Sequence, residues 1–186
     1  VYKRQINSTN VKKDEIIECS KIIESESERL SKLVNTFKYL QPSNKESFEI
    51  VNIGEAIKDS IKICELDNKN KSISLTFETF TESLNIKANK ELLKIVFINL
   101  IKNAYDSIPN EGNITVRTKI NKKYKLNKKN FIIIQIIDNG KGISETDIKK
   151  LFKPFFTTKK SGQGIGLFIS QKIINKFDGY IEAVCI

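Results

Sequence analysis

The amino-acid sequence predicts an α+β domain that follows a long, coiled-coil-like helix. Before Pro42 the apolar residues recur at heptad spacing, and after it short alternating segments are mixed with helical ones. The 186 residues are 39% hydrophobic and include 11 Phe, enough for one domain of ordinary size and an appendage. We therefore divide the chain into residues 1–42 and 43–186.

The first predicted element is a helix over residues 14–40. Its apolar residues fall on the a and d positions of successive heptads, although Glu26 interrupts one d position. A seam of this kind is typical of a helix that packs against a partner helix. Pro42 cannot continue the helix and ends it. The seam consists of Ile16, Cys19, Ile23, Leu30, Leu33, Phe37 and Leu40.

Short strands and one helix are predicted next. Residues 48–51 form an extended segment, and residues 54–66 form a helix with its apolar residues on one side. Ile73, Leu75 and Phe77 alternate with polar residues, as in a half-buried strand. Another short strand is expected at residues 84–87.

The second half of the domain is predicted from the same signals. Asn89 caps a helix over residues 90–107, which ends before Pro109. Residues 113–120 and 130–138 form a long hairpin, and Ser144 with Asp147 resembles a capping box that opens a short helix ending at residue 150. A last helix over residues 166–177 is followed by a turn and a strand at 180–184.

The charge pattern does not favour nucleic acid as a partner. The net charge of +10 comes mainly from lysine, because arginine occurs only at positions 4, 29 and 117, whereas nucleic-acid readers favour arginine forks and aromatic stacking. The lysine-rich stretch 119–129 is best explained as a solvated hairpin loop. An anionic partner is the alternative for this stretch.

The cysteines and the apolar runs argue against a zinc site and against a membrane span. The three cysteines are widely spaced and the chain has no histidine, so the usual mixed zinc sites are excluded and reduced thiols are expected. No apolar run approaches the roughly 20 residues of a membrane span. The chain also lacks methionine. We therefore expect a cytoplasmic piece of a longer protein, which is anchored to a membrane, if at all, through segments outside this chain.

Two asparagines interrupt the apolar helix 90–107. Asn99 and Asn103 are four residues apart, so their carboxamides emerge on one face. A buried carboxamide requires a partner. Carboxamide oxygens suit Mg²⁺, and the amide NH₂ groups can donate to phosphate. Asparagines bonded to neighbouring backbone are the alternative at this point.

An acidic residue and two glycines follow the apolar strand. Asp138 ends the strand, and Gly140 and Gly142 permit a tight turn with close approach of a ligand. A carboxylate here can accept a hydrogen bond from an exocyclic amine such as that of adenine. Asp-Asn-Gly is also common turn chemistry.

A third segment, Gly-Gln-Gly-Ile-Gly at 162–166, leads directly into a helix. Glycines at a helix N-terminus present free backbone N–H groups and the positive end of the helix dipole to an anion. The segment before it, 151–160, contains phenylalanines for packing under a lid, and then Thr157, Thr158 and Lys159 for a terminal phosphate. A flexible hinge is the alternative for the glycines alone.

In this order the segments resemble the N, G1, F and G2 boxes of bacterial sensor histidine kinases, which share a GHKL superfamily with Hsp90, type II topoisomerases and MutL. The resemblance covers residues 48–184. It implies a Bergerat-type α/β sandwich, in which a mixed sheet packs on helices beneath a mobile ATP lid. It also implies transfer of the γ-phosphate of ATP to a histidine. Residues 14–40 resemble the second helix of the dimerisation and phosphoacceptor hairpin.

The resemblance assigns roles to individual residues. Asn103 would bind Mg²⁺ with Asn99 assisting, Asp138 would bind the adenine amino group, and Lys159 with Lys102 would offset phosphate charge. Because Asn99 stands where the hydrolases of the superfamily have a glutamate, and a carboxamide cannot act as a general base, transfer is favoured over hydrolysis. The other residues expected at the nucleotide are Gly140, Gly142, Ile143, Phe152, Phe156, Thr157, Thr158, Gly162, Gly164, Ile165, Gly166 and Leu167.

Partners and departures follow from the same resemblance. It implies a response regulator receiver domain as partner and a homodimer through the helical hairpin. The phosphoacceptor histidine is absent and is expected upstream of residue 1; Asp106 replaces a common lysine or arginine, and the closing strand of the sheet is expected to be missing. The alternatives are a superfamily ATPase, an anti-sigma-factor serine kinase and a nucleotide-binding pseudokinase.

Overall fold

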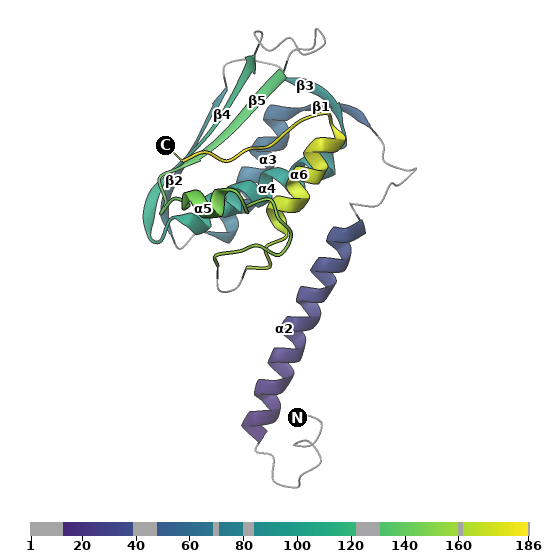
Figure 1. The fold of residues 1–186 in the computed structure, drawn as a ribbon, viewed down its shortest axis with the longest axis vertical. Coiled ribbons are helices and arrows are strands. Elements are labelled where there is room, and N and C mark those ends of the chain that lie inside the picture. Colours follow the sequence, from purple (N-terminus) through teal and green to yellow (C-terminus); the bar gives the residue numbers. More distant parts are fainter. Residues whose placement is uncertain are drawn as a thin grey trace. The chain divides into compact units, whose positions relative to one another are not determined.

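The computed structural model describes residues 13–38, 48–68, 71–79, 84–121, 131–159 and 162–185. The chain divides into two compact units, Val1–Pro42 and Ser43–Ile186, drawn in Figure 1. The predicted lysine-rich hairpin loop lies outside the described residues, apart from its first three positions, and so does the segment around Pro42.

The described residues of the first unit form the helix α2 (Lys13–Lys38), which confirms the predicted helix. Two residues of the predicted seam, Ile16 and Ile23, are 56% and 65% exposed within the single chain. The side chains of the later seam residues lie outside the described set. The predicted packing against a partner helix therefore stays a prediction.

A mixed three-stranded sheet organises the second unit. Its order is β2 (Ser72–Thr79), β4 (Glu111–Asn121) and β5 (Phe131–Asp138). β2 runs parallel to β4, and β4 runs antiparallel to β5. The register pairs Ile114 with Asp138, so the acidic residue ends β5 opposite the beginning of β4. This confirms both the α+β class and the predicted hairpin.

Two short strands lead into the two longer helices of this unit. β1 (Glu49–Asn52) pairs antiparallel with β3 (Asn85–Ala88). The side chain of Asn52 accepts a hydrogen bond at the start of α3 (Ile53–Asp67), and that of Asn89 does the same for α4 (Lys90–Ser107). Such caps satisfy N–H groups that have no partner within the helix. The predicted cap at Asn89 is confirmed.

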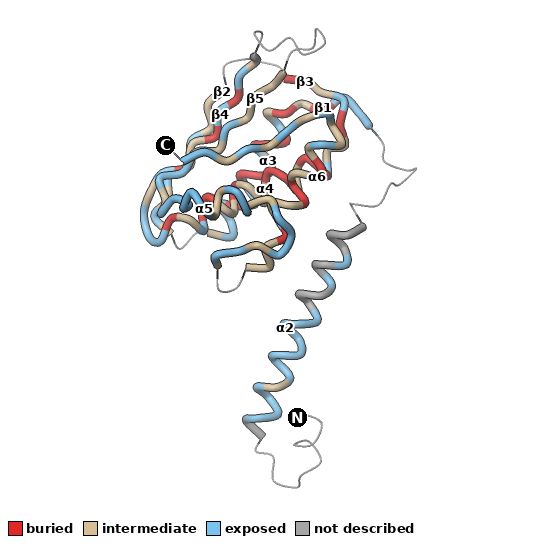
Figure 2. Tube along the Cα trace, viewed as in Figure 1, coloured by how far each residue is buried: buried red, intermediate tan, exposed pale blue. Residues whose placement is uncertain are grey.

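The core lies between the helices and one face of the sheet. α3, α4 and α6 (Gly166–Lys176) pack together on this side, and α4 also contacts β5 (Figure 1). Figure 2 shows the most buried segments concentrated along these helices and the middle of β4. Ile114, Val116 and Thr118 of β4 point into this core, whereas Arg117 lies on the exposed face. α4 is therefore the central helix of the domain.

The predicted strand at 180–184 is wrong. Among the described residues, this segment is paired with no strand of either sheet. Tyr180 and Val184, the first and last residues of the predicted strand, are 71% and 78% exposed. An extended segment becomes a strand only when its backbone pairs with another strand, and its own residues do not specify that partner. The other predicted strands and helices are found within a few residues of their expected bounds.

Candidate nucleotide-binding site

One face of α4 carries four polar residues close to its C-terminal end. Asn103 follows Asn99 by four residues, and Asp106 and Ser107 follow Asn103 by three and four residues, which places all four on the same side of the helix. The opposite side is occupied by core residues such as Ile101 and Tyr105. Each polar residue bonds to a segment outside α4, so this face holds together parts of the chain that are distant in sequence.

Asn99 is connected to the last helix. Its Nδ2 donates to Oγ of Ser170 at 2.8 Å, and Ser170 is fully buried in α6. Gly166 begins α6 directly against the carboxamide of Asn99, where an added Cβ would overlap its oxygen. The Asn99 oxygen is thus held at the N-terminus of α6. The bond to Ser170 gives the amide nitrogen of Asn99 a structural role, and the oxygen is left for a ligand.

Asn103 and Asp106 share one cation. Nζ of Lys159 lies 2.8 Å from Oδ1 of Asn103 and 2.8 Å from Oδ2 of Asp106. Lys159 comes from the segment between α5 (Glu145–Ile148) and α6. The oxygens of Asn103 and Asp106 therefore already bind a positive charge, which is here the ammonium group of Lys159.

Asp138 is connected to the end of α4. Its Oδ1 accepts hydrogen bonds from Oγ of Ser107 at 2.6 Å and from the backbone N–H of Gly140 at 3.0 Å. The backbone N–H of Lys141 donates to the carbonyl of Ser107 at 3.1 Å. Asn139 fixes the same turn to β4, because its Oδ1 accepts from the N–H of Asn113 at 2.8 Å. The turn is therefore attached at two points.

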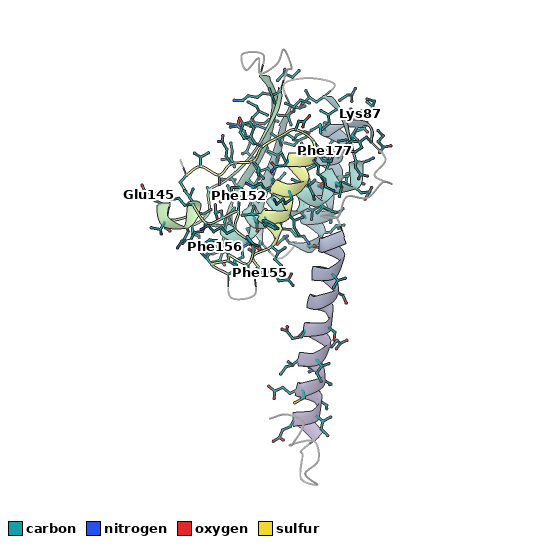
Figure 3. All side chains as sticks on the ribbon, turned by 45° about the vertical axis from the view of Figure 1, so that its right-hand side comes forward. Lys87, Glu145, Phe152, Phe155, Phe156 and Phe177 are labelled. Carbon is teal, nitrogen blue, oxygen red and sulfur yellow. The ribbon has the colours of Figure 1, made fainter. Side chains whose placement is uncertain are left out.

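The segment from 143 to 159 lies beside the beginning of α6. Figure 3 shows Phe152, Phe155 and Phe156 along it. Phe152 and Phe156 are half-buried, whereas Phe155 is 67% exposed and has a φ of 65°, a left-handed conformation that costs free energy in a residue with a Cβ. Ser144 caps α5 through the N–H of Asp147, which confirms the first half of the predicted capping box.

Two threonines precede Lys159. Oγ1 of Thr157 accepts a hydrogen bond from the backbone N–H of Lys159 at 3.1 Å, and Thr158 is exposed. The backbone of Gly162 returns to this turn, where its N–H donates to the carbonyl of Lys159 at 3.2 Å. The predicted Thr-Thr-Lys group and the glycine segment are therefore adjacent.

The glycine segment makes close backbone contacts. Gly164 has a φ of 67°, and an added Cβ would overlap the backbone of Phe155 and Phe156. A residue with a side chain does not fit there. Ile165 is buried at the start of α6, and the helix has no side-chain N-cap bond. Its first N–H groups are suited to an anion.

The remaining predicted residues are placed less centrally. Gly142 has a φ of 69° with open space where a Cβ would stand, Ile143 is 41% exposed, and Leu167 is half-buried. Lys102 is directed elsewhere, since its Nζ forms an ion pair of 2.6 Å with Asp67 of α3. Its predicted role at the phosphates finds no support in this geometry.

Reasoning from the sequence missed three residues of this site, two on α4 and one on α6. Asp106 was considered only as a departure from a family pattern, and Ser107 and Ser170 were not considered. The spacing of three and four residues from Asn103 was a signal for Asp106 and Ser107. Ser170 had no comparable signal, because it reaches Asn99 only through the packing of α6 on α4.

The donor set fits Mg²⁺ and a nucleotide. Magnesium usually binds one or two protein oxygens together with phosphates and water. The oxygens of Asn103 and Asp106 already hold a cation, and the described residues contain no larger group of His, Cys, Asp or Glu able to hold a metal. Magnesium bound there would reduce the negative charge of the phosphates.

Among the helices that the structure describes, none combines the length and apolar character required to cross a membrane.

Comparison with known proteins identifies related sequences. Residues 88–185 match the family described as histidine kinase-, DNA gyrase B-, and HSP90-like ATPase. The sensor histidine kinase ZraS of Salmonella typhi is 30% identical over 165 residues, which are 89% of this chain and 34% of that protein. Sporulation kinase D of Bacillus subtilis is 30% identical over 162 residues, 87% of this chain and 31% of that protein. The chain thus spans about a third of the length of these relatives.

Solved structures show the same fold. The catalytic domain of histidine kinase ThkA is 31% identical with a TM-score of 0.60, over 70% of this chain and 81% of that one. ThkA in complex with the response regulator protein TrrA is 25% identical with a TM-score of 0.68, over 96% of this chain and 49% of that one.

Proposed function

This chain belongs to the histidine kinase-, DNA gyrase B- and HSP90-like ATPase family, and from that premise we propose that it is the ATP-binding catalytic part of a sensor histidine kinase. In this reaction the bond between the γ-phosphorus and the β–γ bridging oxygen of ATP breaks, and a bond from phosphorus to an imidazole nitrogen forms. The chain has no histidine, so the acceptor lies on residues outside it. The similarity to sensor histidine kinases along 89% of this chain supports the proposal.

The convergence of three segments on one face of α4 carries the proposal. Asp138 reaches this face through Ser107, and Lys159 reaches it through Asn103. The N-terminus of α6 reaches it through Asn99. An acceptor for an exocyclic amine, a cation with metal-binding oxygens, and free helix N–H groups are the three parts that a purine nucleotide with a phosphate chain requires.

The chemistry of these residues favours transfer over hydrolysis. Asn99 carries a carboxamide, which cannot take a proton from water as a general base. Its Nδ2 is committed to Ser170 at 2.8 Å, so its position is defined. Catalysis would then depend on positioning the γ-phosphate and on stabilising its charge, for which Lys159 supplies a cation.

The wider setting of the activity is part of the same proposal. A response regulator receiver domain would accept the phosphate from the histidine, as the ThkA complex with a response regulator protein suggests by similarity. Helix α2 would contribute to a homodimer through a helical hairpin, because Ile16 and Ile23 of its seam are exposed. The reaction would take place in the cytoplasm, with any membrane attachment outside this chain.

Two measurements test the proposal. Calorimetric titration of this chain with ADP should show binding that is stronger with Mg²⁺ than with EDTA. The full-length protein incubated with γ-labelled ATP should acquire label that is lost in acid and retained in base, as phosphohistidine is. Rapid release of inorganic phosphate without labelled protein would support the hydrolase alternative and overturn the kinase assignment.

A further inference from the structure

Ser107 is the last residue of α4 and lies beside the carboxylate expected to bind adenine. Its Oγ is 2.6 Å from Oδ1 of Asp138. Because an ionised carboxylate can only accept, the hydroxyl must be the donor in this bond. A hydrogen bond to a charged acceptor is among the stronger ones in proteins.

The hydroxyl of Ser107 has another acceptor within reach. The carbonyl of Ala104 lies 2.7 Å from Oγ, as is common for serine in a helix. One hydroxyl proton cannot serve both acceptors fully. The hydroxyl is therefore shared between the carbonyl of Ala104 and Oδ1 of Asp138, and the charged acceptor forms the stronger of the two bonds.

The surroundings of Ser107 define which oxygen of Asp138 is engaged. Oδ1 receives both Ser107 and the N–H of Gly140, while the described bonds leave Oδ2 for a ligand. Gly140 lies so close to Ser107 that an added Cβ would overlap its side chain. The N–H of Lys141 also bonds to the carbonyl of Ser107. Ser107 thus bonds to the turn after β5 through both its side chain and its backbone carbonyl.

We propose that Ser107 is a positioning residue that sets the preference of this site for purines carrying a 6-amino group. It holds Oδ1 of Asp138, so that Oδ2 is presented to the exocyclic amine of adenine. The exposed carboxylate would otherwise keep only the N–H of Gly140 and would rotate more freely. This inference rests on the proposed nucleotide site and adds to it a residue that determines base selectivity.

The test compares two nucleotides on the purified chain. Binding of ADP and of purine riboside diphosphate, which lacks the 6-amino group, is measured by calorimetry with Mg²⁺ for wild type and Ser107→Ala. We expect the wild-type preference for ADP to fall by about 5-fold or more in Ser107→Ala, in line with loss of a hydrogen bond to a charged group. Affinity for the analogue should stay nearly constant, which a general structural defect would not allow.

A double-mutant cycle makes the test specific. In an Asp138→Asn background, Ser107→Ala should change the preference no further, because both changes act through one carboxylate. Ser74→Ala, at an exposed position of β2, is the matched control and should leave the preference unchanged. Circular dichroism and melting temperature verify that each variant is folded.

The outcomes separate this inference from the proposed function. An unchanged preference in folded Ser107→Ala, with wild type binding ADP, overturns the role of Ser107 alone. An equal loss for both nucleotides also overturns it and indicates a structural role. Absence of ADP binding by the wild-type chain overturns the nucleotide site, and this inference with it.

Discussion

The ammonium group of Lys159 lies 2.8 Å from Oδ1 of Asn103 and thereby connects the segment after α5 to the central helix. The same group lies 2.8 Å from Oδ2 of Asp106. Under the proposed function, a magnesium ion would bind the oxygens of α4, and the terminal phosphate would bind the ammonium group of Lys159. Binding of the nucleotide would then require Lys159 to exchange the two oxygens of α4 for phosphate.

Replacement of Lys159 by methionine should weaken the binding of nucleotides that have a third phosphate. We expect about 10-fold weaker binding of a non-hydrolysable ATP analogue with Mg²⁺, since a charge-assisted hydrogen bond is lost. Binding of Mg-ADP should change less. Calorimetry measures both affinities, and Lys153→Met, an exposed lysine of the same segment, is the control. Equal losses for the two nucleotides would argue against a contact with the terminal phosphate.

Replacement of Asn103 by alanine should remove the effect of magnesium on ADP binding. The carboxamide oxygen is the expected protein ligand of the ion, so affinities measured with Mg²⁺ and with EDTA should become nearly equal. Asn175→Ala, at an exposed position of α6, should retain the difference. A full magnesium effect in Asn103→Ala would assign the metal to other oxygens.

Replacement of Gly166 by alanine should disturb Asn99. The added methyl group would overlap the carboxamide of Asn99, and relieving the overlap costs about 1–3 kcal/mol, as in other overpacked sites. We expect a lower melting temperature together with weaker Mg-nucleotide binding. Gly54→Ala in α3 is the comparison, because its added Cβ would lie 3.3 Å from Oδ1 of Asn52, a tight contact that a small shift of this side chain relieves. A melting temperature equal to wild type would show that α6 can move away from α4.

Stability should depend on Cys64 in alkaline solution. Burial raises the pKa of the Cys64 thiol from 9.0 to about 11, against the opposing charge of Lys102. Since the folded state holds this proton more tightly than the unfolded one, the contribution is complete below about pH 9 and is lost as pH rises towards the folded pKa.

Urea unfolding of wild type and Cys64→Ala between pH 8 and about pH 10.5 measures this effect. The free energy of unfolding of wild type should decline more steeply than that of the variant. The variant is the control for lysines and tyrosines that titrate in the same range. Parallel curves would mean that the thiol titrates alike in the folded and unfolded states.

Local signals in the sequence were sufficient for most elements. Asn89 before an apolar helix and Pro109 after it were enough to place α4, because capping and termination are decided by neighbouring residues. The segment at 180–184 shows where this reasoning ends. It was predicted as a strand, yet Tyr180 is exposed and the segment is unpaired among the described residues, since pairing depends on a distant backbone.

In the candidate site, too, some features follow from local sequence and others from the tertiary structure. Asn99, Asn103 and Asp138 were predicted as binding residues from residue type and spacing, because the chemistry of carboxamides, carboxylates and glycine turns is local. Which partners they meet was decided by the tertiary structure. Lys102 was expected at the phosphates but pairs with Asp67, and Lys159 is the lysine that reaches Asn103.

The sequence by itself determined the order of elements and the candidate residues for binding a nucleotide, because helix periodicity, caps and glycine turns depend on near neighbours. Only the packing of β5, α6 and the segment after α5 on one face of α4 decided how those residues combine. That packing brings Ser107 to Asp138 and Ser170 to Asn99. Such bonds join residues 31 and 71 positions apart, and no local pattern specifies them.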